Sequence, residues 1–146
     1  MQTYLIKAIL SDRFGRVKGN PYRIIAISEN FTLYQLADAI CGSFGFDFDH
    51  AFGFYNNIKS LRNSVECYEL FADMEDVDSE CKSVEKIRIS KVFSQINKKM
   101  LFLFDYGDEW RFIVELKGIK ITDEQPKYAA VVESVGDAPL QYDEMD

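Results

Sequence analysis

Alternating hydrophobic and polar positions mark two strands near the start of the chain, over residues 3–10 and 22–28. Both runs are rich in β-branched and aromatic residues, and the segment between them contains two glycines, an asparagine and a proline, which is typical of a wide loop. In the first run, apolar side chains fill one face and part of the other. This pattern predicts strands that lie well inside a sheet.

Over residues 33–44 the apolar residues recur about every 3.6 positions, in place of every second position as in the strands. Thr32 is placed to cap this helix, since its hydroxyl can accept the backbone N–H of Gln35 while the Gln35 side chain bonds the backbone of Thr32. Gly45 is placed to end the helix in a left-handed conformation. The apolar stripe predicts a helix lying on a sheet, and it comprises Leu33, Leu36, Ala37, Ile40, Cys41 and Phe44.

Further strand patterns occupy the second half of the chain, with a short helix between them. The predicted strands cover residues 51–57, 85–89, 99–106, 109–116 and 127–134, and Ser90 is predicted to cap a short helix that stops at Asn97. Residues 99–106 are apolar on both faces, which is typical of a central strand. In the strand that follows, one face carries Trp110, Phe112, Val114 and Leu116.

These elements predict an α+β fold in a single domain spanning residues 1–146, because strands surround one main helix and one short helix. The sheet is expected to be mixed or antiparallel, with the main helix (33–44) packed on one face. The first half has the order of a β-grasp unit, two strands followed by a helix that crosses the sheet. No repeat or linker marks a second domain, and an acidic tail begins at about residue 140.

Composition agrees with a soluble domain of ordinary hydrophobicity and adds an unusual number of aromatic residues. The 146 residues include twelve Phe, eight Tyr and one Trp, which predicts a core of large, flat side chains. The net charge of -7 repels phosphate backbones and anionic lipid surfaces, so nucleic acid is disfavoured as a partner. The densest basic cluster along the sequence, Lys91 with Lys98 and Lys99, is interpreted as solubilising charge near a sheet edge.

Three cysteines, at positions 41, 67 and 81, have no metal-type spacing. Cys41 falls on the buried face of the predicted helix, and a disulfide framework is not expected, which favours the cytoplasm. The N-terminal residues lack the basic and apolar regions of a signal peptide, and no stretch approaches the length of a membrane span, so no membrane partner is expected.

One group of residues could be reactive: His50, which is the only histidine, with Asp105, Asp108 and Glu109. If the loop after the helix reaches the turn at 105–109, these groups could bind a divalent metal or act as an acid–base pair. The alternative, which we favour, is structural. Gly107 would supply positive φ, the aspartates would accept loop N–H groups, and Trp110 would pack in the core with its indole N–H bonded.

Other chemistry finds little support in the sequence. No nucleophile elbow, catalytic triad spacing or nucleotide-binding loop is present, so no cofactor is evident and a divalent metal is the sole candidate. The acidic run Asp73, Glu75, Asp76, Asp78 and Glu80 lacks the glycine and final glutamate of a calcium-binding EF-hand loop. It is interpreted as a solvated loop.

Two segments together resemble the Ri-plasmid ORF-3-like protein family, which includes the passenger protein of a bacterial insertion element. The first is the helix that ends at Phe44, Gly45 and Phe46, where tryptophan is more usual at the last position, followed by His50. The second runs from Phe104 through Asp105, Tyr106, Gly107, Asp108 and Glu109 to Trp110, and completes the family's late motif. The family's C-terminal cysteine has no counterpart after Gly136, Ala138 and Pro139. The resemblance implies an α+β bacterial protein of unassigned biochemistry. The family's association with mobile DNA is one of neighbourhood and not of mechanism.

Three hypotheses of function remain. The favoured one is a non-enzymatic interaction module that binds a protein or peptide by a sheet edge or an aromatic patch. The second is a metal-binding protein or metal-dependent enzyme that uses His50 with Asp105 and Asp108. The third, an accessory role in transactions of mobile-element DNA, rests on the family's neighbourhood alone and is opposed by the net charge. The sequence carries no signal for the oligomeric state.

Overall fold

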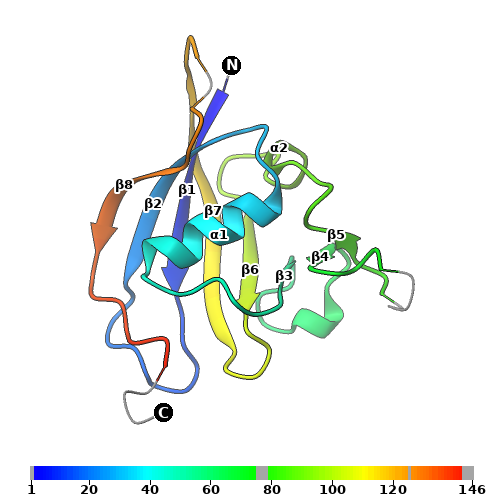
Figure 1. Ribbon diagram of the computed structural model, residues 1–146, viewed down its shortest axis with the longest axis vertical. Helices are drawn as coiled ribbons and strands as arrows, with labels where there is room; N and C mark the ends of the chain where they lie inside the picture. Colours follow the sequence, from blue (N-terminus) through cyan, green and yellow to red (C-terminus); the bar gives the residue numbers. More distant parts are fainter. Residues whose placement is uncertain (1, 75–78, 125, 143–146) are drawn as a thin grey trace.

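In the computed structural model, one main helix lies across an eight-stranded sheet (Figure 1). The structure describes residues 2–74, 79–124 and 126–142. The strands are β1 (Gln2–Leu10), β2 (Tyr22–Ser28), β3 (Phe52–Tyr55), β4 (Cys67–Glu69), β5 (Lys82–Ser83), β6 (Lys99–Phe104), β7 (Trp110–Ile121) and β8 (Ala130–Val135). The helices are α1 (Leu33–Ser43), the 3₁₀ turn η1 (Leu61–Asn63) and α2 (Ile89–Val92).

The sheet has the order β5-β4-β3-β6-β7-β1-β2-β8. All neighbouring strands pair antiparallel except β4 and β5, which are parallel. The mixed sheet with one main helix confirms the α+β prediction, and β6 lies centrally as its apolar pattern predicted. The β-grasp order is not confirmed, because β3 returns beside β6 instead of pairing with β1, whose second neighbour is β7.

Local signals define both ends of α1 as predicted. The Thr32 hydroxyl accepts the Gln35 backbone N–H at 3.2 Å, and the Gln35 side chain accepts the Thr32 N–H at 2.8 Å. At the other end Gly45 has a φ of +74°, and the N–H of Phe46 donates to the Cys41 carbonyl at 2.8 Å. These bonds satisfy backbone groups that a helix end otherwise leaves unpaired.

Removing the helix cap should weaken the fold measurably. In Thr32→Ala the Gln35 N–H loses its acceptor, so we expect the free energy of unfolding to fall by about 1 kcal/mol in a urea titration. Thr32→Ser keeps the hydroxyl and should stay within about 0.5 kcal/mol of the parent. An equal loss in both variants would mean that the methyl group, rather than the cap, carries the effect.

The core between α1 and the sheet is aromatic. Phe102 on β6 stacks on Phe54 of β3 with ring centroids 4.8 Å apart and on Phe112 of β7 at 5.4 Å. The opposite face of the sheet carries a smaller buried cluster of Tyr55, Leu101 and Leu103, covered by partly buried Ile58, Leu61 and Cys67. The segment containing η1 therefore covers part of β3 and β6 on the face of the sheet opposite α1.

Residues 85–89 do not form the predicted strand. Only Arg88 makes an isolated bridge, to Thr32, while the Ile87 carbonyl accepts the Leu33 N–H at 3.0 Å. The backbone of this segment is thus engaged by the start of α1 and is not available to the sheet. The short helix α2 begins at Ile89, so Ser90 lies inside it and makes no side-chain cap, contrary to the prediction. Within the described ranges, no helix is long and apolar enough to cross a membrane.

A disulfide joins Cys67 and Cys81, which corrects the expectation from the cysteine count. Cys67 begins β4, and Cys81 immediately precedes β5, the parallel neighbour of β4. This pairing brings the two Cα atoms to 4.9 Å, within the usual range for a disulfide. The argument from unpaired cysteines to a reducing compartment therefore loses its basis. Cys41 is free and buried on α1, as predicted, and burial raises the pKa of its thiol strongly.

Candidate functional site

The turn between β6 and β7 is built by Asp105. Its Oδ1 accepts the N–H of Gly107 at 3.0 Å and of Asp108 at 3.2 Å, and its carbonyl accepts the Glu109 N–H. Positive φ occurs at Asp105 (+67°) and Glu109 (+53°), whereas Gly107 is not in the left-handed region. The prediction that Gly107 supplies the positive φ was therefore wrong, because the aspartate side chain stabilises that conformation by bonding local N–H groups.

Trp110, the next residue of the motif, is buried between Phe46 and Arg16. Its ring centroid lies 5.0 Å from that of Phe46, and the Arg16 guanidinium carbon lies 3.6 Å from the Trp110 ring centroid, a cation–π contact. The indole N–H has no hydrogen-bond partner among the described residues, contrary to the prediction. Arg16 in turn donates to the Asp108 carbonyl at 2.9 Å and to Asp12 at 2.8 Å.

The Asp12–Arg16 pair holds the loop after β1 over the tryptophan. Burial by itself raises the pKa of Asp12, but hydrogen bonds from the Arg16 side chain and from backbone N–H groups outweigh burial, so the pKa of Asp12 lies below its usual value. Asp12 therefore stays ionised as a partner for Arg16. The sequence carried no signal for this contact because 94 residues separate Arg16 from Trp110.

His50 reaches the motif, as the reactive-site hypothesis required. Its Nε2 lies 3.4 Å from Asp105 Oδ2, 3.5 Å from Asp49 Oδ1 and 2.9 Å from the Tyr142 hydroxyl. Because the Tyr142 O–H donates to Asp49 Oδ2 at 2.6 Å, its oxygen is left to accept the Nε2–H of His50. One imidazole nitrogen thus faces two carboxylates and a phenol, a set of groups capable of proton exchange.

The C-terminal segment completes this cluster. After β8 the chain continues below α1 in the view of Figure 1. It reaches the loop at residues 47–50, where Gln141 accepts the Asp47 N–H at 2.6 Å and donates to the Asp47 carbonyl at 3.0 Å. The hydrogen bond to Asp49 raises the pKa of Tyr142 to about 12, so its hydroxyl is protonated near neutral pH. Asp49 and Tyr142 were missed in the sequence. Asp49 is adjacent to His50 but belongs to no recognised pattern, and no local pattern links His50 to Tyr142, which lies 92 positions away.

The other two predicted carboxylates do not join His50. Glu109 forms an ion pair with Arg13 at 2.9 Å, and neither Asp108 nor Glu109 lies within 4.0 Å of the His50 ring nitrogens in the way that Asp105 and Asp49 do. In the part of the chain that the structure describes, no three histidine, cysteine or acidic side chains are grouped to hold a metal. Glu75, Asp76 and Asp78 of the acidic run lie outside the described residues, so the interpretation of that run as a solvated loop stays a prediction.

A small cavity of about 330 Å³ adjoins His50. Its lining is mostly apolar, with Tyr34, Phe48, Phe52 and Leu70 beside Asp49 and His50. A site of this kind could take a small molecule with a single polar group. The cluster is therefore a candidate for acid–base chemistry or for binding, and it also ties the C-terminal segment to the loop after α1.

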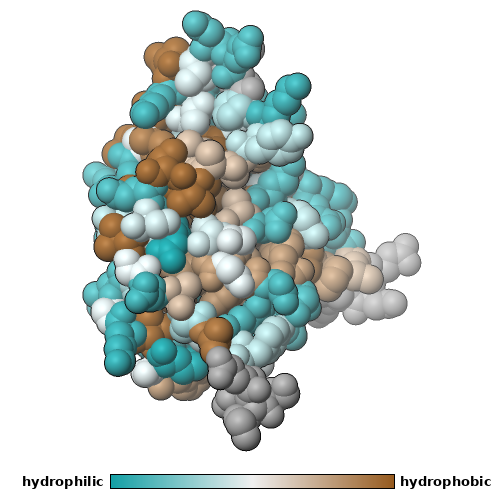
Figure 2. Space-filling view, turned by 60° about the vertical axis from the view of Figure 1, so that its left-hand side comes forward, coloured by the Kyte–Doolittle hydropathy of each residue, from teal (hydrophilic) through white to brown (hydrophobic). Residues whose placement is uncertain are grey.

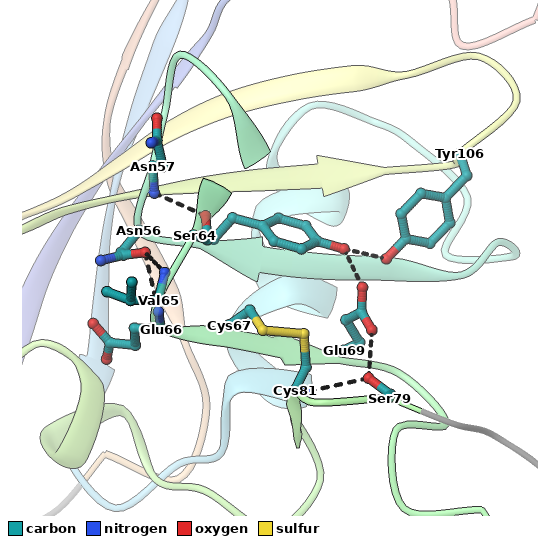
Figure 3. The surroundings of a disulfide bond; sticks show 11 residues. Asn56, Asn57, Ser64, Val65, Glu66, Cys67, Glu69, Ser79, Cys81 and Tyr106 are labelled. Carbon is teal, nitrogen blue, oxygen red and sulfur yellow. Dashed lines mark hydrogen bonds between the residues drawn. A yellow bond between two sulfur atoms is a disulfide. The ribbon is translucent and has the colours of Figure 1, made fainter. Parts of the chain in front are cut away.

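A second polar chain lies on the opposite face of the sheet, beside the disulfide (Figure 3). Tyr55 donates to Glu69 Oε2 at 2.5 Å, and Ser79 donates to Glu69 Oε1 at 3.0 Å. Because the Tyr55 proton is engaged by Glu69, the Tyr106 hydroxyl donates to the Tyr55 oxygen at 2.8 Å. Burial raises the pKa of Tyr106 to about 12. A Cβ atom at Gly53 would lie only 2.6 Å from the Tyr55 oxygen, so a larger residue there would displace the tyrosine pair.

Comparison with known proteins places these features in a family. A family model described as plasmid pRiA4b ORF-3-like protein matches residues 14–141. A crystal structure of a protein of unknown function, MM3350 from Methanosarcina mazei Go1, has a similar fold, with a TM-score of 0.70 and 21% identity over 91% of this chain and 69% of that chain. None of the curated proteins matches this sequence. The similarity to the archaeal structure supports the fold and carries no statement about activity.

Proposed function

The chain belongs to the plasmid pRiA4b ORF-3-like protein family, and we propose that it is a non-enzymatic binding module that takes an extended peptide along the edge strand β8. The observation that carries this proposal is the exposure of that strand. Among the described residues β8 pairs only with β2, and all six residues of β8, Ala130–Val135, are exposed. An uncovered strand edge presents unpaired backbone groups to which another strand can bond.

Apolar side chains accompany the open edge. Val131 and Val132 are 48% and 57% exposed, and Tyr128, just before the strand, is 81% exposed. Figure 2 shows this side of the molecule, where hydrophobic side chains are grouped among polar ones. Natural edge strands usually carry charge or proline that prevents pairing, and β8 has Glu133 as its only charged residue. A bulge at Val132, between the partners of Ile24 and Ile25, divides the edge into two short segments.

A cavity of about 530 Å³ lies between the first of these segments and α1. The helix contributes Ala39 and Gly42, and the strand side contributes Ala129 and Val131. These small side chains leave room for a side chain of the bound peptide. The charges at the rim, Asp38 and Lys127, balance each other, which favours an apolar occupant. In strand addition, backbone bonds supply affinity and such a pocket supplies specificity.

Substitution within β8 tests this proposal. Peptides selected from a random phage-displayed library against the folded chain should share an apolar residue within an extended segment. Val131→Lys puts a charge at the pocket, so we expect it to weaken binding of a selected peptide about tenfold or more, measured by fluorescence anisotropy. Val65→Lys is the matched control, because Val65 is 94% exposed and lies outside the β8 edge.

Two results would contradict the peptide proposal. One is equal affinity of the selected peptides for Val131→Lys, Val65→Lys and the parent chain. The other is a concentration-dependent dimer, seen in analytical ultracentrifugation and dissociated by Val131→Lys, which would assign the edge to a second copy of the chain.

A metal-binding or metal-dependent enzymatic role is the weaker proposal, supported by the 3.4 Å approach of His50 to Asp105. These side chains are not arranged to hold a metal as they stand, so a site would require them to move, with Asp49 in place of Asp108 as a further ligand and the Tyr142 hydroxyl released from the imidazole. Titration calorimetry with Mn²⁺, Mg²⁺ and Zn²⁺ tests it, because a genuine site would give saturable heat that His50→Ala abolishes. An accessory role in DNA transactions rests on the family resemblance alone, and the charge of -7 opposes it.

A further inference from the structure

A cleft of about 610 Å³ opens beside the β6–β7 turn, on the face of the sheet that α1 does not cover. Three segments far apart in the sequence line it: the loop after β1, the segment around η1, and the β6–β7 hairpin. Its charged lining consists of four cationic side chains and one carboxylate, which are Arg13, Lys59, Arg62, Arg111 and Glu109.

The cleft carries a local positive charge in a chain whose net charge is -7. Glu109 is paired with Arg13 at 2.9 Å and balances that residue. No ion pair within 4.0 Å engages Lys59, Arg62 or Arg111 among the described residues, although other arginines and lysines of the chain have such partners. Three cations therefore face one concave space without a carboxylate to neutralise them, which favours an anion there.

The cationic segment is held in place by hydrogen bonds that do not use its charges. The Ser60 N–H donates to the Asn57 side chain at 2.9 Å, and the Asn57 N–H donates to Ser64 at 3.0 Å, the latter bond being drawn in Figure 3. Arg111 is half-buried and donates one N–H to the Ile58 carbonyl at 3.2 Å, so its other guanidinium N–H groups can still bind a ligand. Such a framework reduces the entropy lost when a ligand is bound.

Apart from Ser60, the remaining lining of the cleft is apolar or aromatic. Leu103 is 3% exposed and forms part of the buried cluster on this face, with Leu61 packed against it. Tyr106 contributes its ring, because its hydroxyl proton is directed to Tyr55. The cleft thus combines a cationic rim with an apolar surface, and its volume lies within the range of small-molecule sites.

We propose that this cleft binds a small organic phosphate ester, whose phosphate is held by Lys59, Arg62 and Arg111 and whose body lies against Leu61 and Leu103. Guanidinium groups bind phosphate through paired N–H donors, which suits the two arginines. A small ligand is favoured over nucleic acid because the cations are confined to one cleft and do not form a stripe along which a strand could lie. The site lies on the opposite face from the cavity between α1 and β8, so it does not depend on the proposed peptide site.

Phenyl phosphate is the probe that tests this proposal, with phenol as its counterpart without a phosphate. At low salt we expect saturable binding of phenyl phosphate by titration calorimetry, weaker binding of inorganic phosphate, and none of phenol. Arg62→Glu should weaken binding of phenyl phosphate about tenfold or more, since it replaces a charge-assisted donor by a repulsive carboxylate. Arg62 is exposed and makes no ion pair among the described residues, so the variant should remain folded.

Lys120→Glu is the matched control, because it makes the same change in net charge at an exposed position on the distal end of β7. It should change the affinity less than twofold, and Lys59→Glu should reproduce the loss seen with Arg62→Glu. Absence of saturable binding to the parent chain, or equal losses in Lys120→Glu and Arg62→Glu, would overturn the proposal. Binding of a single-stranded oligonucleotide that depends on Arg62, without binding of phenyl phosphate, would also overturn it.

Discussion

Replacing Phe102 with alanine should lower the free energy of unfolding by about 3–5 kcal/mol. Phe102 is fully buried on the central strand β6, with Phe54, Phe112 and Phe52 at ring-centroid distances of 4.8, 5.4 and 5.6 Å. Truncation removes the ring from the middle of this group and leaves a space that four neighbouring aromatic rings, Phe104 included, cannot fill without moving. Urea unfolding followed by tryptophan fluorescence measures the loss.

Tyr128→Ala provides the comparison for Phe102→Ala. Tyr128 is 81% exposed, so its truncation should change the free energy of unfolding by no more than about 0.5 kcal/mol. The contrast tests whether the aromatic residues stabilise the chain through burial. A loss below about 1 kcal/mol in Phe102→Ala would mean that the core can rearrange around the missing ring, which a closely packed interior resists.

The elements predicted correctly are those with strong local signals. The helix α1 has a cap residue, a reciprocal side chain three positions later, an apolar stripe and a glycine at its end, and each of these acts over only a few residues. The central place of β6 also follows from its own residues, since a strand apolar on both faces must be covered on both. In these cases the local sequence and the tertiary packing favour the same structure.

The predictions that were wrong depended on contacts between distant segments. Residues 85–89 have a strand-like pattern, but their backbone is engaged by the start of α1, with the Ile89 N–H bonded to the Phe31 carbonyl at 2.8 Å. The disulfide forms because a parallel pairing of β4 and β5 aligns two cysteines, and that pairing has no signature in the cysteine spacing. Tertiary context overrides a short local pattern in both cases.

The candidate sites show the same division. His50 and Asp105 could be connected from the sequence because His50 follows the early segment of the family pattern and Asp105 lies in its late motif. The basic cleft could not, since Arg13, Arg62 and Arg111 lie on three separate segments, and the densest basic cluster along the sequence lies elsewhere. Lys98 of that cluster is bound to Glu66 at 2.9 Å, so charge density along the chain did not indicate where positive charge remains unpaired.

Substitutions of Asp105 should separate the turn from the chemistry of the histidine cluster. In Asp105→Ala the N–H groups of Gly107 and Asp108 lose their acceptor and a non-glycine residue without a polar side chain must keep a φ of +67°. We expect the free energy of unfolding to fall by about 2–4 kcal/mol. Asp105→Asn keeps an oxygen acceptor and tolerates the left-handed conformation, so its loss should be about 1 kcal/mol or less.

His50→Ala, made alone and in the Asp105→Asn background, measures how much the Asp105 charge adds to stability through its contact with His50. The His50 side chain is 38% exposed, so its contact with Asp105 should contribute no more than about 1 kcal/mol of coupling in a double-mutant cycle. If Asp105→Asn lowers the free energy of unfolding as much as Asp105→Ala does, the turn-building role is refuted. The aspartate would then stabilise the chain through its charge. If Asp105→Ala loses more stability than Asp105→Asn, the role of the motif aspartate is to accept two backbone N–H groups and to adopt the left-handed conformation. Any activity of His50 must then be sought in the small aromatic cavity beside it.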